Sequence, residues 1–377
     1  MKPLDLLHLC YLWCMTYPRE RQRWLCADEQ RKNGSVRVFY GYEQVPGPDQ
    51  KVFGGMVKLQ DLQGTFANHV DQPNILYLIS SALPYFPVRM AQMAKRAGVK
   101  LVLNQNGVAY PGWHGPGWEK TNQPMQELTA LADYILYQSE FCKLAAETFL
   151  GEYSGSSEVL YNAVDTDQFI SGPKKEQNEI VLLLAGSHWS QYRPFLAIEA
   201  LQKVLFLDKR VRLRIAGRFC WEQDTSLAEK QVREFARHAG VDDFVEYTGS
   251  YSQHEAVSLL QSADILLHTK YNDPCPRLVL EAMSCGLPIV YSATGGVPEL
   301  VGNEAGVGVP GPLDWQKDHP PTSDALAEAV VQVLAGLPDY AVAARKRAVH
   351  LFDRKNWIER HREIFTACLD SFARDQH

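Results

Sequence analysis

The chain has 377 residues, of which 46% are hydrophobic and 22% are charged, and its formal net charge is −6. This composition excludes a disordered or fibrous protein, and the negative charge excludes a generally basic protein, so we expect no nucleic-acid partner. No apolar run reaches the length of about 18 residues that a transmembrane helix needs. At about 150 residues per domain, the length predicts two domains.

Eight cysteines are scattered along the chain without a Cys-x-x-Cys pair or the spacing of a metal site. They predict reduced thiols in a cytoplasmic protein, with no bound metal. Residues 4–17 are fairly apolar, but Asp5 and His8 interrupt them and no clear cleavage site follows. We therefore disfavour a secretory signal and assign residues 1–33 to an N-terminal extension.

The first half of the chain alternates apolar runs with helical patterns. Strands are predicted at 36–40, 74–79, 99–103 and 134–137, and helices at 56–66, 87–97, 123–132 and 139–149. Ser139 is placed to cap the last of these helices. The continuous apolar run at 74–79 is typical of a strand buried on both faces. The alternation predicts a parallel α/β domain over residues 34–165.

The pattern restarts after a polar stretch. A strand is predicted at 159–161, a linker at 172–178, and a second series of strands at 180–184, 211–215, 245–247, 264–267 and 288–291. We assign residues 166–338 to a second α/β domain and residues 339–377 to C-terminal helices. Ligands bind outside the carboxyl ends of parallel strands, so two such domains predict a ligand cleft between two sheets.

The most informative segment is residues 273–290. It predicts a loop, a helix that begins near Pro276 and ends at Gly286, and then a strand. Free N–H groups at the start of such a helix suit a diphosphate. Asp273 and Glu281 flank this position, where carboxylates can accept hydrogen bonds from sugar hydroxyls. The structural alternatives are a loop-forming role for Asp273 and a buried role for Glu281.

Two glycine pairs, Gly54-Gly55 and Gly295-Gly296, permit close approach of the backbone, and Pro298 starts a helix after the second pair. A lone glycine pair predicts no more than a turn. Neither domain has a Gly-x-Gly-x-x-Gly fingerprint after its first strand. This disfavours a dinucleotide-dependent oxidoreductase.

In their order, these residues resemble the signature of retaining glycosyltransferases of family 4, part of glycosyl transferases group 1. The resemblance is strongest over residues 159–302. It rests on Asp273, Glu281, Ala282, Cys285, Gly286, Pro288, Gly295, Gly296 and Glu299, with Phe169 and the stretches 159–165, 182–186 and 216–217. It implies the GT-B fold, an α/β architecture in which the parallel sheets of two Rossmann-like domains face each other across a cleft.

The resemblance also implies the role of each matched position. Glu281 would hold the ribose of a nucleotide-diphosphate sugar and Asp273 would face the donor sugar. Asn106 and Arg193 do not match the family pattern, and we add them as further candidate catalytic residues. The donor site would be completed by Gly54, Gly55, Gly186, Ser187, Gly217, Arg277, Leu278, Gly295 and Gly296. No metal or other cofactor would be needed, because basic side chains and helix N-termini offset the charge of the leaving diphosphate.

Some positions depart from the family pattern. The family often has arginine and lysine where this chain has Ser187 and Tyr192, so Arg193 and Arg277 are the candidates to supply positive charge. Asn106 stands where many members have histidine, and an amide can bind a sugar hydroxyl without supplying charge. These losses leave open a catalytically inactive GT-B subunit that binds nucleotide or glycan. They also leave open a turn-forming role for Asn106 and a solvated helix start for Arg193.

Two further regions bear on the acceptor. His114 and Trp113 lie in an aromatic loop and could stack on a sugar, with a surface histidine as the alternative. Residues 345–362 contain seven basic and two acidic side chains. This segment could face anionic lipid headgroups or an anionic acceptor, with a solvated face as the alternative.

The last apolar residues have helical spacing: Ile364, Phe365, Cys368, Leu369 and Phe372. In the resembled family a C-terminal helix packs back on the first domain, which would account for this face. The resemblance thus implies a retaining hexosyltransferase that acts on a glycan or lipid-linked acceptor. We expect it in the cytoplasm, with a peripheral contact at the inner face of the membrane.

Overall fold

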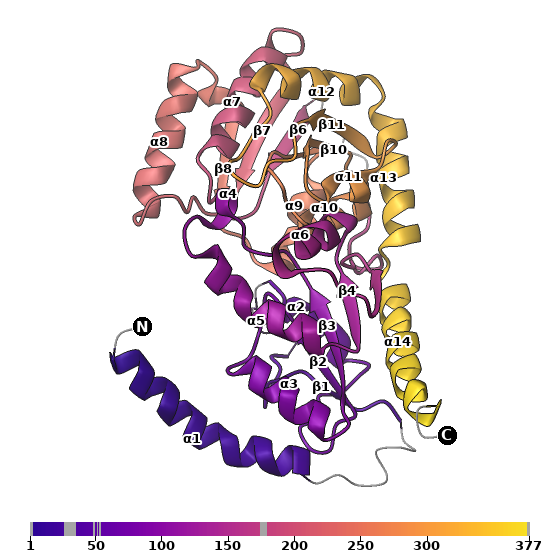
Figure 1. Ribbon diagram of the computed structural model, residues 1–377. Helices are drawn as coiled ribbons and strands as arrows, with labels where there is room; N and C mark the ends of the chain where they lie inside the picture. Colours follow the sequence, from indigo (N-terminus) through magenta and orange to yellow (C-terminus); the bar gives the residue numbers. More distant parts are fainter. Residues whose placement is uncertain are drawn as a thin grey trace. The chain divides into compact units, whose positions relative to one another are not determined.

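The computed structural model describes residues 3–25, 35–47, 50, 52, 54–173 and 179–374 (Figure 1). The chain folds into two units. Unit 1 comprises Met1–Leu160 and Asn356–His377, and unit 2 comprises Tyr161–Lys355. The sequence placed these divisions at 165/166 and 338/339. The predicted linker at 172–178 lies outside the described residues from position 174 onward.

Unit 1 contains a parallel sheet whose strand order follows the chain. Its strands are β1 (Val38–Phe39), β2 (Ile75–Ile79), β3 (Lys100–Gln105), β4 (Tyr134–Tyr137) and β5 (Ser156–Val159). The four strands predicted for the first domain are confirmed. β5 ends at Val159, where the sequence had predicted a strand to begin. Every residue of β2 is buried, as its unbroken apolar run indicated.

Six helices precede and connect these strands: α1 (Pro3–Leu25), α2 (Met56–Gln63), α3 (Pro87–Arg96), α4 (Pro111–His114), α5 (Trp118–Leu131) and α6 (Glu140–Leu150). α1 and α4 were not predicted. α5 begins five residues earlier than predicted, after Gly117 in the left-handed region, and carries Pro124 inside it. The predicted cap of α6 is confirmed, because the Ser139 hydroxyl accepts a hydrogen bond from the Cys142 amide at 3.0 Å.

Unit 2 contains a six-stranded parallel sheet in the order β11-β10-β9-β6-β7-β8. Its strands are β6 (Ile180–Leu184), β7 (Val211–Ala216), β8 (Val245–Gly249), β9 (Ile265–His268), β10 (Ile289–Ala293) and β11 (Gly306–Pro310). The sequence missed β11, which is rich in glycine. Gly306 is required there, since a Cβ at this position would lie 2.0 Å from the carbonyl oxygen of Ile289 on β10.

Helices cover both faces of the unit 2 sheet. They are α7 (Tyr192–Leu205), α8 (Thr225–His238), α9 (Gln253–Gln261), α10 (Arg277–Ser284), α11 (Val297–Val301), α12 (Ser323–Ala335) and α13 (Leu337–Leu351). Successive side chains of a strand point to opposite faces. Accordingly, Leu183 joins the core beneath α10, whereas Leu182 and Leu184 join the core beneath α7 and α12.

The last helix, α14 (Arg354–Arg374), belongs to unit 1 from Asn356 onward. Ile364, Phe365 and Cys368 are buried, which confirms the apolar face predicted from their spacing. The ring centroid of Phe365 lies 5.2 Å from that of Phe66 and 5.7 Å from that of Tyr77. The side chain of Phe372 lies outside the described part of the chain.

Most arginines of the basic segment 345–362 are held by neighbours within their own unit. Arg345 donates to carbonyls of Thr166, Phe169 and Ser284, Arg347 to those of Glu299 and Leu300, Arg354 pairs with Asp165, and Arg360 pairs with Glu158. The guanidinium groups of these four residues thus already have backbone carbonyls or carboxylates of the fold as partners. The expectation that the segment faces anionic lipid headgroups or an anionic acceptor stays a prediction.

Among the described helices, none has by itself the length and apolar composition to cross a membrane. Only α12 and α13 taken together pass that criterion, and the pair is bent by 92°. α12 packs on α7 and β11. These contacts are those of a core helix of unit 2.

Candidate functional site

The main candidate site lies where the strand order of unit 2 reverses. β6 and β9 are neighbours, but the chain continues from β6 to β7 on one side and from β9 to β10 on the other. The loops after these two strands therefore diverge at the carboxyl edge of the sheet, which is where open α/β sheets bind ligands. Both loops, residues 185–191 and 269–276, carry residues of the predicted donor site.

Asp273 is a buried carboxylate held between two nitrogen atoms. Its side chain is 12% exposed, and its Oδ2 lies 3.1 Å from Nε2 of His268 and 3.2 Å from Nζ of Lys270. Burial opposes ionisation of this carboxyl, but Lys270 and His268 outweigh the burial and hold its pKa well below the usual range. Asp273 therefore carries a fixed negative charge at neutral pH, which a residue that merely shapes a loop does not require.

His268 is the buried last residue of β9, and sequence reasoning missed it together with Lys270. Burial lowers the pKa of His268 even though Asp273 favours its charged form, so the ring is neutral. A neutral ring that donates from Nε2 to Asp273 leaves Nδ1 as an acceptor. Within the described residues Nδ1 has no hydrogen-bond partner. The signal in the sequence was the polar residue that ends an otherwise apolar strand, five positions before Asp273.

Arg193 is buried in the first turn of α7, with 5% of its surface exposed. Its guanidinium donates to the carbonyl oxygens of Ser187 at 3.1 Å and Ala185 at 3.4 Å. Burial lowers its pKa and the Asp273 carboxylate raises it. The alternative of a solvated helix start is thus wrong. Arg193 closes the loop after β6 and places positive charge near Asp273.

The start of α10 carries an ion pair. Nε of Arg277 lies 3.1 Å from Oε1 of Glu281, one helical turn later. Tyr251, in the loop after β8, is a neighbour that sequence reasoning missed. Burial and the nearby Glu281 carboxylate raise the pKa of Tyr251 to about 12. A Cβ on Gly186 would lie 3.9 Å from Leu278, so α10 and the loop after β6 meet at this edge.

The backbone at Gly295-Gly296 packs closely against the loop of residues 269–276, which contains Asp273. The close approach predicted for this glycine pair is therefore to the protein's own backbone. Gly295 has a φ of +68°, and a Cβ there would lie 2.5 Å from the carbonyl oxygen of Asp273. The Gly296 amide donates to that same oxygen at 2.9 Å. Glycine is required at position 217 for a similar reason, since an added Cβ would lie 1.9 Å from the carbonyl oxygen of Gly186. These glycines hold the site loops in register, whatever they contribute to a ligand.

A second polar group forms at the carboxyl ends of β2 and β3 in unit 1. Asn106 donates from its side-chain Nδ2 to the Ser81 hydroxyl, and its backbone N–H donates to the Ser80 hydroxyl at 2.8 Å. Nζ of the buried Lys58 lies 2.7 Å from Oδ1 of Asn104 and 3.1 Å from Oδ1 of Asn106. The side chain of Asn106 thus contacts Lys58 as well as its own turn, and its role at the site stays a prediction. The sequence missed Lys58, whose signal is a lysine just after the Gly54-Gly55 pair.

Behind Lys58, hydrogen bonds continue in one direction into the core of unit 1. Asn104 donates to the Tyr77 hydroxyl at 3.0 Å, and that hydroxyl lies 3.0 Å from Nε2 of His361. Nδ1 of His361 lies 2.8 Å from the Trp357 carbonyl oxygen. Nδ1 must be the donor in that contact, so Nε2 accepts from Tyr77. Burial lowers the pKa of His361 to about 4, and the charge of Lys58 adds to this effect.

Gly54 and Gly55, which were predicted to bind the donor, lie just before α2, the helix that carries Lys58. A Cβ on Gly55 would lie 2.7 Å from Ile79 and 2.8 Å from the Ser81 hydroxyl oxygen, so Gly55 brings the start of α2 against the end of β2. Gly54 has a φ of +56° and open space around it.

The predicted acceptor residues lie apart from that group, on α4. Trp113 is 62% exposed, and Nε2 of His114 lies 2.9 Å from the Thr121 hydroxyl. Their hydrogen bonds and ring contacts are to Tyr110, Gly115, Thr121 and one another. Within the described residues the structure thus brings neither of them to Lys58 or Asn106.

Comparison with known proteins gives one family match. Residues 165–344 match the family of glycosyl transferases group 1. Among curated relatives, a D-inositol 3-phosphate glycosyltransferase of Streptomyces bingchenggensis is 27% identical over 37% of this chain and 32% of its own length. The human alpha-1,3/1,6-mannosyltransferase ALG2 is 26% identical over 46% of this chain and 45% of its own length. The aligned part thus spans less than half of either relative.

Solved structures extend the likeness over both units. HepE of Anabaena, in complex with UDP and glucose, has a TM-score of 0.61 at 19% identity, over 78% of each chain. A glycosyltransferase of Rickettsia africae has a TM-score of 0.63 at 15% identity, over 93% of each chain. At these identities the likeness concerns the fold, and it confirms the GT-B fold that the sequence predicted.

Proposed function

We propose that this chain, whose residues 165–344 match the family of glycosyl transferases group 1, transfers a sugar from a nucleotide-diphosphate sugar to a hydroxyl group. The observation that carries the proposal is the ionised Asp273, held by His268 and Lys270 at the strand-order reversal of unit 2. HepE binds UDP and glucose on the same fold, which supports a nucleotide-sugar donor.

We assign a role to each candidate side chain of the unit 2 site. Glu281 accepts hydrogen bonds from the ribose hydroxyls, and Arg277 holds it in place. Asp273 accepts from hydroxyls of the donor sugar. Lys270 is the more exposed of the cations beside Asp273, and we assign to it and Arg277 the charge that offsets the leaving diphosphate, without a metal ion. Arg193 instead fixes the loop after β6.

The reaction that we propose retains the anomeric configuration of a hexose. The departing diphosphate takes the proton of the acceptor hydroxyl on the same face of the sugar, as the family resemblance implies. Asn106 with Lys58 positions a substrate hydroxyl at the carboxyl edge of the unit 1 sheet. The intact Asp273–Lys270 pair supports this active enzyme over an inactive nucleotide-binding subunit.

The acceptor that we propose is a glycan or a lipid-linked glycan. Support comes from the names of relatives, which include the gpi3 subunit of a phosphatidylinositol N-acetylglucosaminyltransferase of Schizosaccharomyces pombe and the mannosyltransferase ALG2. We place the reaction at the cytoplasmic face of a membrane. All seven cysteines in the described part of the chain are free thiols, which supports a reducing compartment.

Thermal unfolding with UDP-, GDP-, ADP- and CMP-linked sugars tests the donor site. We expect one nucleotide family to raise the Tm of the native protein, and Glu281→Ala to abolish that rise, because the ribose loses its acceptor. Glu304→Ala, an exposed carboxylate of the same unit, is the matched control and should keep the rise. The absence of a rise with all four donors, or a rise that survives in Glu281→Ala, would contradict the proposal.

A product assay with the donor so identified tests the reaction. We expect release of the nucleoside diphosphate only when an acceptor is present, and a product whose anomeric configuration equals that of the donor sugar. An inverted product would leave the donor site intact but overturn the retaining mechanism.

A further inference from the structure

A groove between α1 and α3 in unit 1 has no part in the proposed reaction. The two helices lie side by side (Figure 1). The groove has a volume of about 620 Å³. One face of α1 contributes Trp13, Tyr17 and Arg21, at four-residue spacing, and one face of α3 contributes Arg89, Met93 and Arg96. Sequence analysis treated residues 1–33 as an extension and did not foresee this groove.

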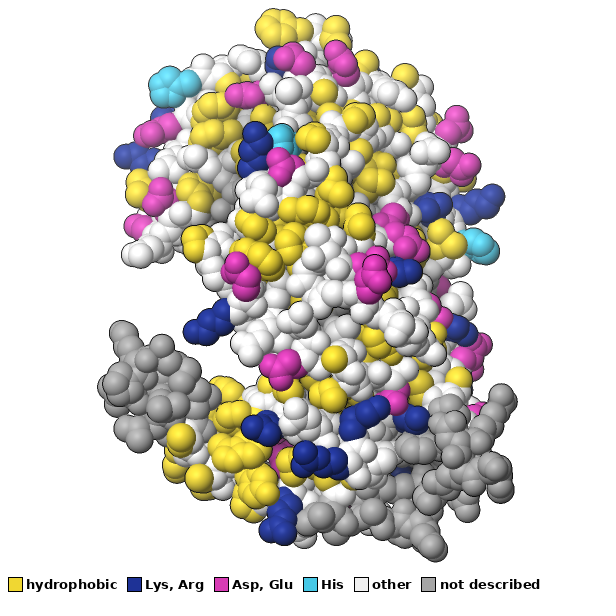
Figure 2. Space-filling model, viewed as in Figure 1, with side chains coloured by type: hydrophobic (Ala, Val, Ile, Leu, Met, Phe, Trp, Pro, Cys, Tyr) yellow, Lys and Arg dark blue, Asp and Glu magenta, His cyan; other side chains and the backbone are white. Residues whose placement is uncertain are grey.

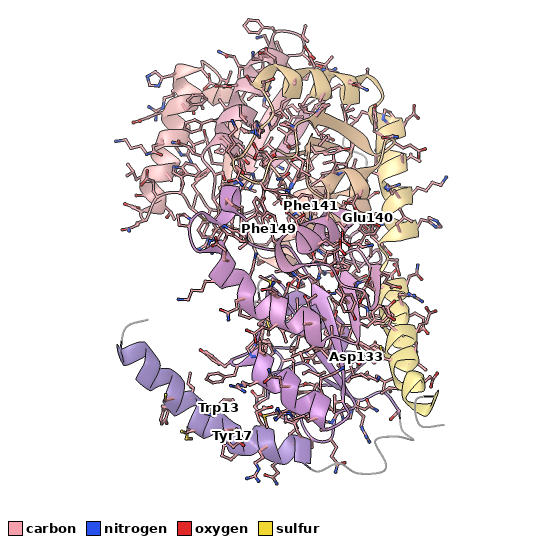
Figure 3. All side chains as sticks on the ribbon, in the orientation of Figure 1. Trp13, Tyr17, Asp133, Glu140, Phe141 and Phe149 are labelled. Carbon is pink, nitrogen blue, oxygen red and sulfur yellow. The ribbon has the colours of Figure 1, made fainter. Side chains whose placement is uncertain are left out.

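The groove is aromatic at one end. The ring centroid of Trp13 lies 5.1 Å from that of Phe86, the residue before α3, and 5.1 Å from that of Tyr17. Figure 3 labels Trp13 and Tyr17 on α1. Further apolar side chains of α1 and of the segment before α3 are exposed: Tyr11 is 62% exposed, Met15 60% and Tyr85 67%. Figure 2 shows hydrophobic side chains gathered with Lys and Arg side chains over α1 and α3. Exposed aromatic and apolar side chains at such density mark an interaction surface.

The groove is also basic. Its described lining includes the exposed Arg21, Arg89 and Arg96 and no carboxylate. Within the described residues these three arginines have no ion-pair partner, whereas nearby Arg23 and Lys95 pair with Glu20 and Asp133. The contrast with α13 and α14 is direct, because there the arginines are held by carbonyls and carboxylates of the fold.

We propose that this groove, lined by α1 and α3, is where the protein docks on an anionic phospholipid bilayer. Guanidinium groups bind phosphate oxygens, and Trp and Tyr rings settle at the level of the headgroups with their apolar bodies toward the acyl chains. A second copy of the chain fits less well. A two-fold interface sets a patch against itself, and here that would oppose arginine to arginine. The inference names the surface that makes the membrane contact of the proposed function, and in that respect it rests on the proposed function; the vesicle experiment below tests this surface without measuring sugar transfer.

Sedimentation of the full chain with vesicles tests the proposal. We expect binding to vesicles of phosphatidylcholine with 30% phosphatidylglycerol, weak binding to phosphatidylcholine alone, and loss of binding at high salt. The variant Arg89→Gln/Arg96→Gln should bind the anionic vesicles about thirtyfold more weakly, at about 1 kcal/mol per basic residue. Lys230→Gln/Arg237→Gln on α8 removes the same charge from an exposed place in unit 2 and should bind like the native chain.

Three results would overturn the proposal. They are equal binding to neutral vesicles, equal loss of binding in the α8 control, and a dimer in analytical ultracentrifugation that Arg89→Gln/Arg96→Gln dissociates.

Hydrogen exchange of the native chain gives a test that needs no variant. Anionic vesicles should protect peptides of α1 and α3, while inorganic phosphate at matched concentration should not; protection by phosphate alone would show a simple anion site instead.

Discussion

The two units build their polar groups in different ways. In unit 2 the strand order reverses between β6 and β9, and Asp273, Arg277, Glu281 and Gly295 come from one short stretch of chain at that reversal. In unit 1 the described strands follow chain order without a reversal, and the group around Lys58 draws on α2, β2, β3 and α14. The two carboxylates of the unit 2 site thus come from one segment, to which Arg193 is added from the start of α7. The group around Lys58 instead joins segments that lie far apart in the chain.

The largest effect should come from the carboxylate at the reversal. Asp273→Asn keeps the shape of the side chain but removes the charge that faces Lys270, so we expect kcat/KM to fall by about 10²- to 10³-fold. Steady-state rates with the donor identified by thermal shift measure this. Asp208→Asn, which removes a partly buried carboxylate paired with Arg210 away from the site, should stay within twofold of the native rate. Similar losses in both variants would mean that the effect is not one of the site.

The buried histidine of unit 1 should make the protein acid-sensitive. The pKa of His361 is about 4 in the folded chain and 6.5 as its ordinary value, so the neutral ring stabilises the fold fully above pH 6.5. This contribution is lost as the pH falls from 6.5 to 4, and amounts to about 3 kcal/mol. Urea unfolding at several pH values should show a shallower pH dependence for His361→Gln than for the native chain.

The buried histidines of unit 2 give the comparison for this experiment. Burial lowers the pKa of His188 to about 3, so its contribution to stability declines over the same range of pH. It should persist in the His361→Gln variant and leave a residual slope. An unchanged slope in His361→Gln would contradict the role assigned to the unit 1 histidine.

Substitution of Gly295, which packs against the backbone of Asp273, should cost more stability than substitution of a glycine with the same backbone angle in open space. Gly295→Ala adds a Cβ 2.5 Å from the Asp273 carbonyl oxygen, whereas Gly240, with a φ of +69°, has open space around it. We expect Gly240→Ala to lower the free energy of unfolding by about 1 kcal/mol and Gly295→Ala by about 3 kcal/mol. Chemical denaturation measures both. Equal losses would mean that backbone angle alone explains the glycine.

The smallest effects are expected from substitutions of Lys58. Two of them separate the contribution of its charge from that of its hydrogen bonds. Lys58→Met leaves the oxygens of Asn104 and Asn106 without this donor, so we expect a loss of about 2 kcal/mol in stability and about tenfold in kcat. Lys58→Gln restores a donor without charge, and should recover stability but not kcat. Recovery of both would show that the ammonium charge contributes nothing to the reaction.

Much of the fold was predictable because its signals are local. Unbroken apolar runs such as residues 75–79 and the cap at Ser139 depend on neighbours in the chain, and they placed most strands correctly. The same holds for the candidate donor site, whose glycines, prolines and carboxylates keep fixed spacing along residues 273–299. β11 escaped because two glycines in five residues weaken any strand pattern, although the fit of Gly306 against β10 requires one of them.

What the sequence determined by itself was the two-sheet α/β fold, the resemblance to glycosyl transferases group 1 and the segment that carries Asp273 and Glu281. Only the tertiary structure decided that His268 and Lys270 hold Asp273, that Arg193 is buried and that Lys58 contacts Asn106. It also decided that Arg21, Arg89 and Arg96, which have no ion-pair partner in the described part of the chain, line one groove on α1 and α3. The physical reason is that charge pairing and burial depend on distances in space. A count of basic residues along the chain does not reveal which of them the fold has already partnered.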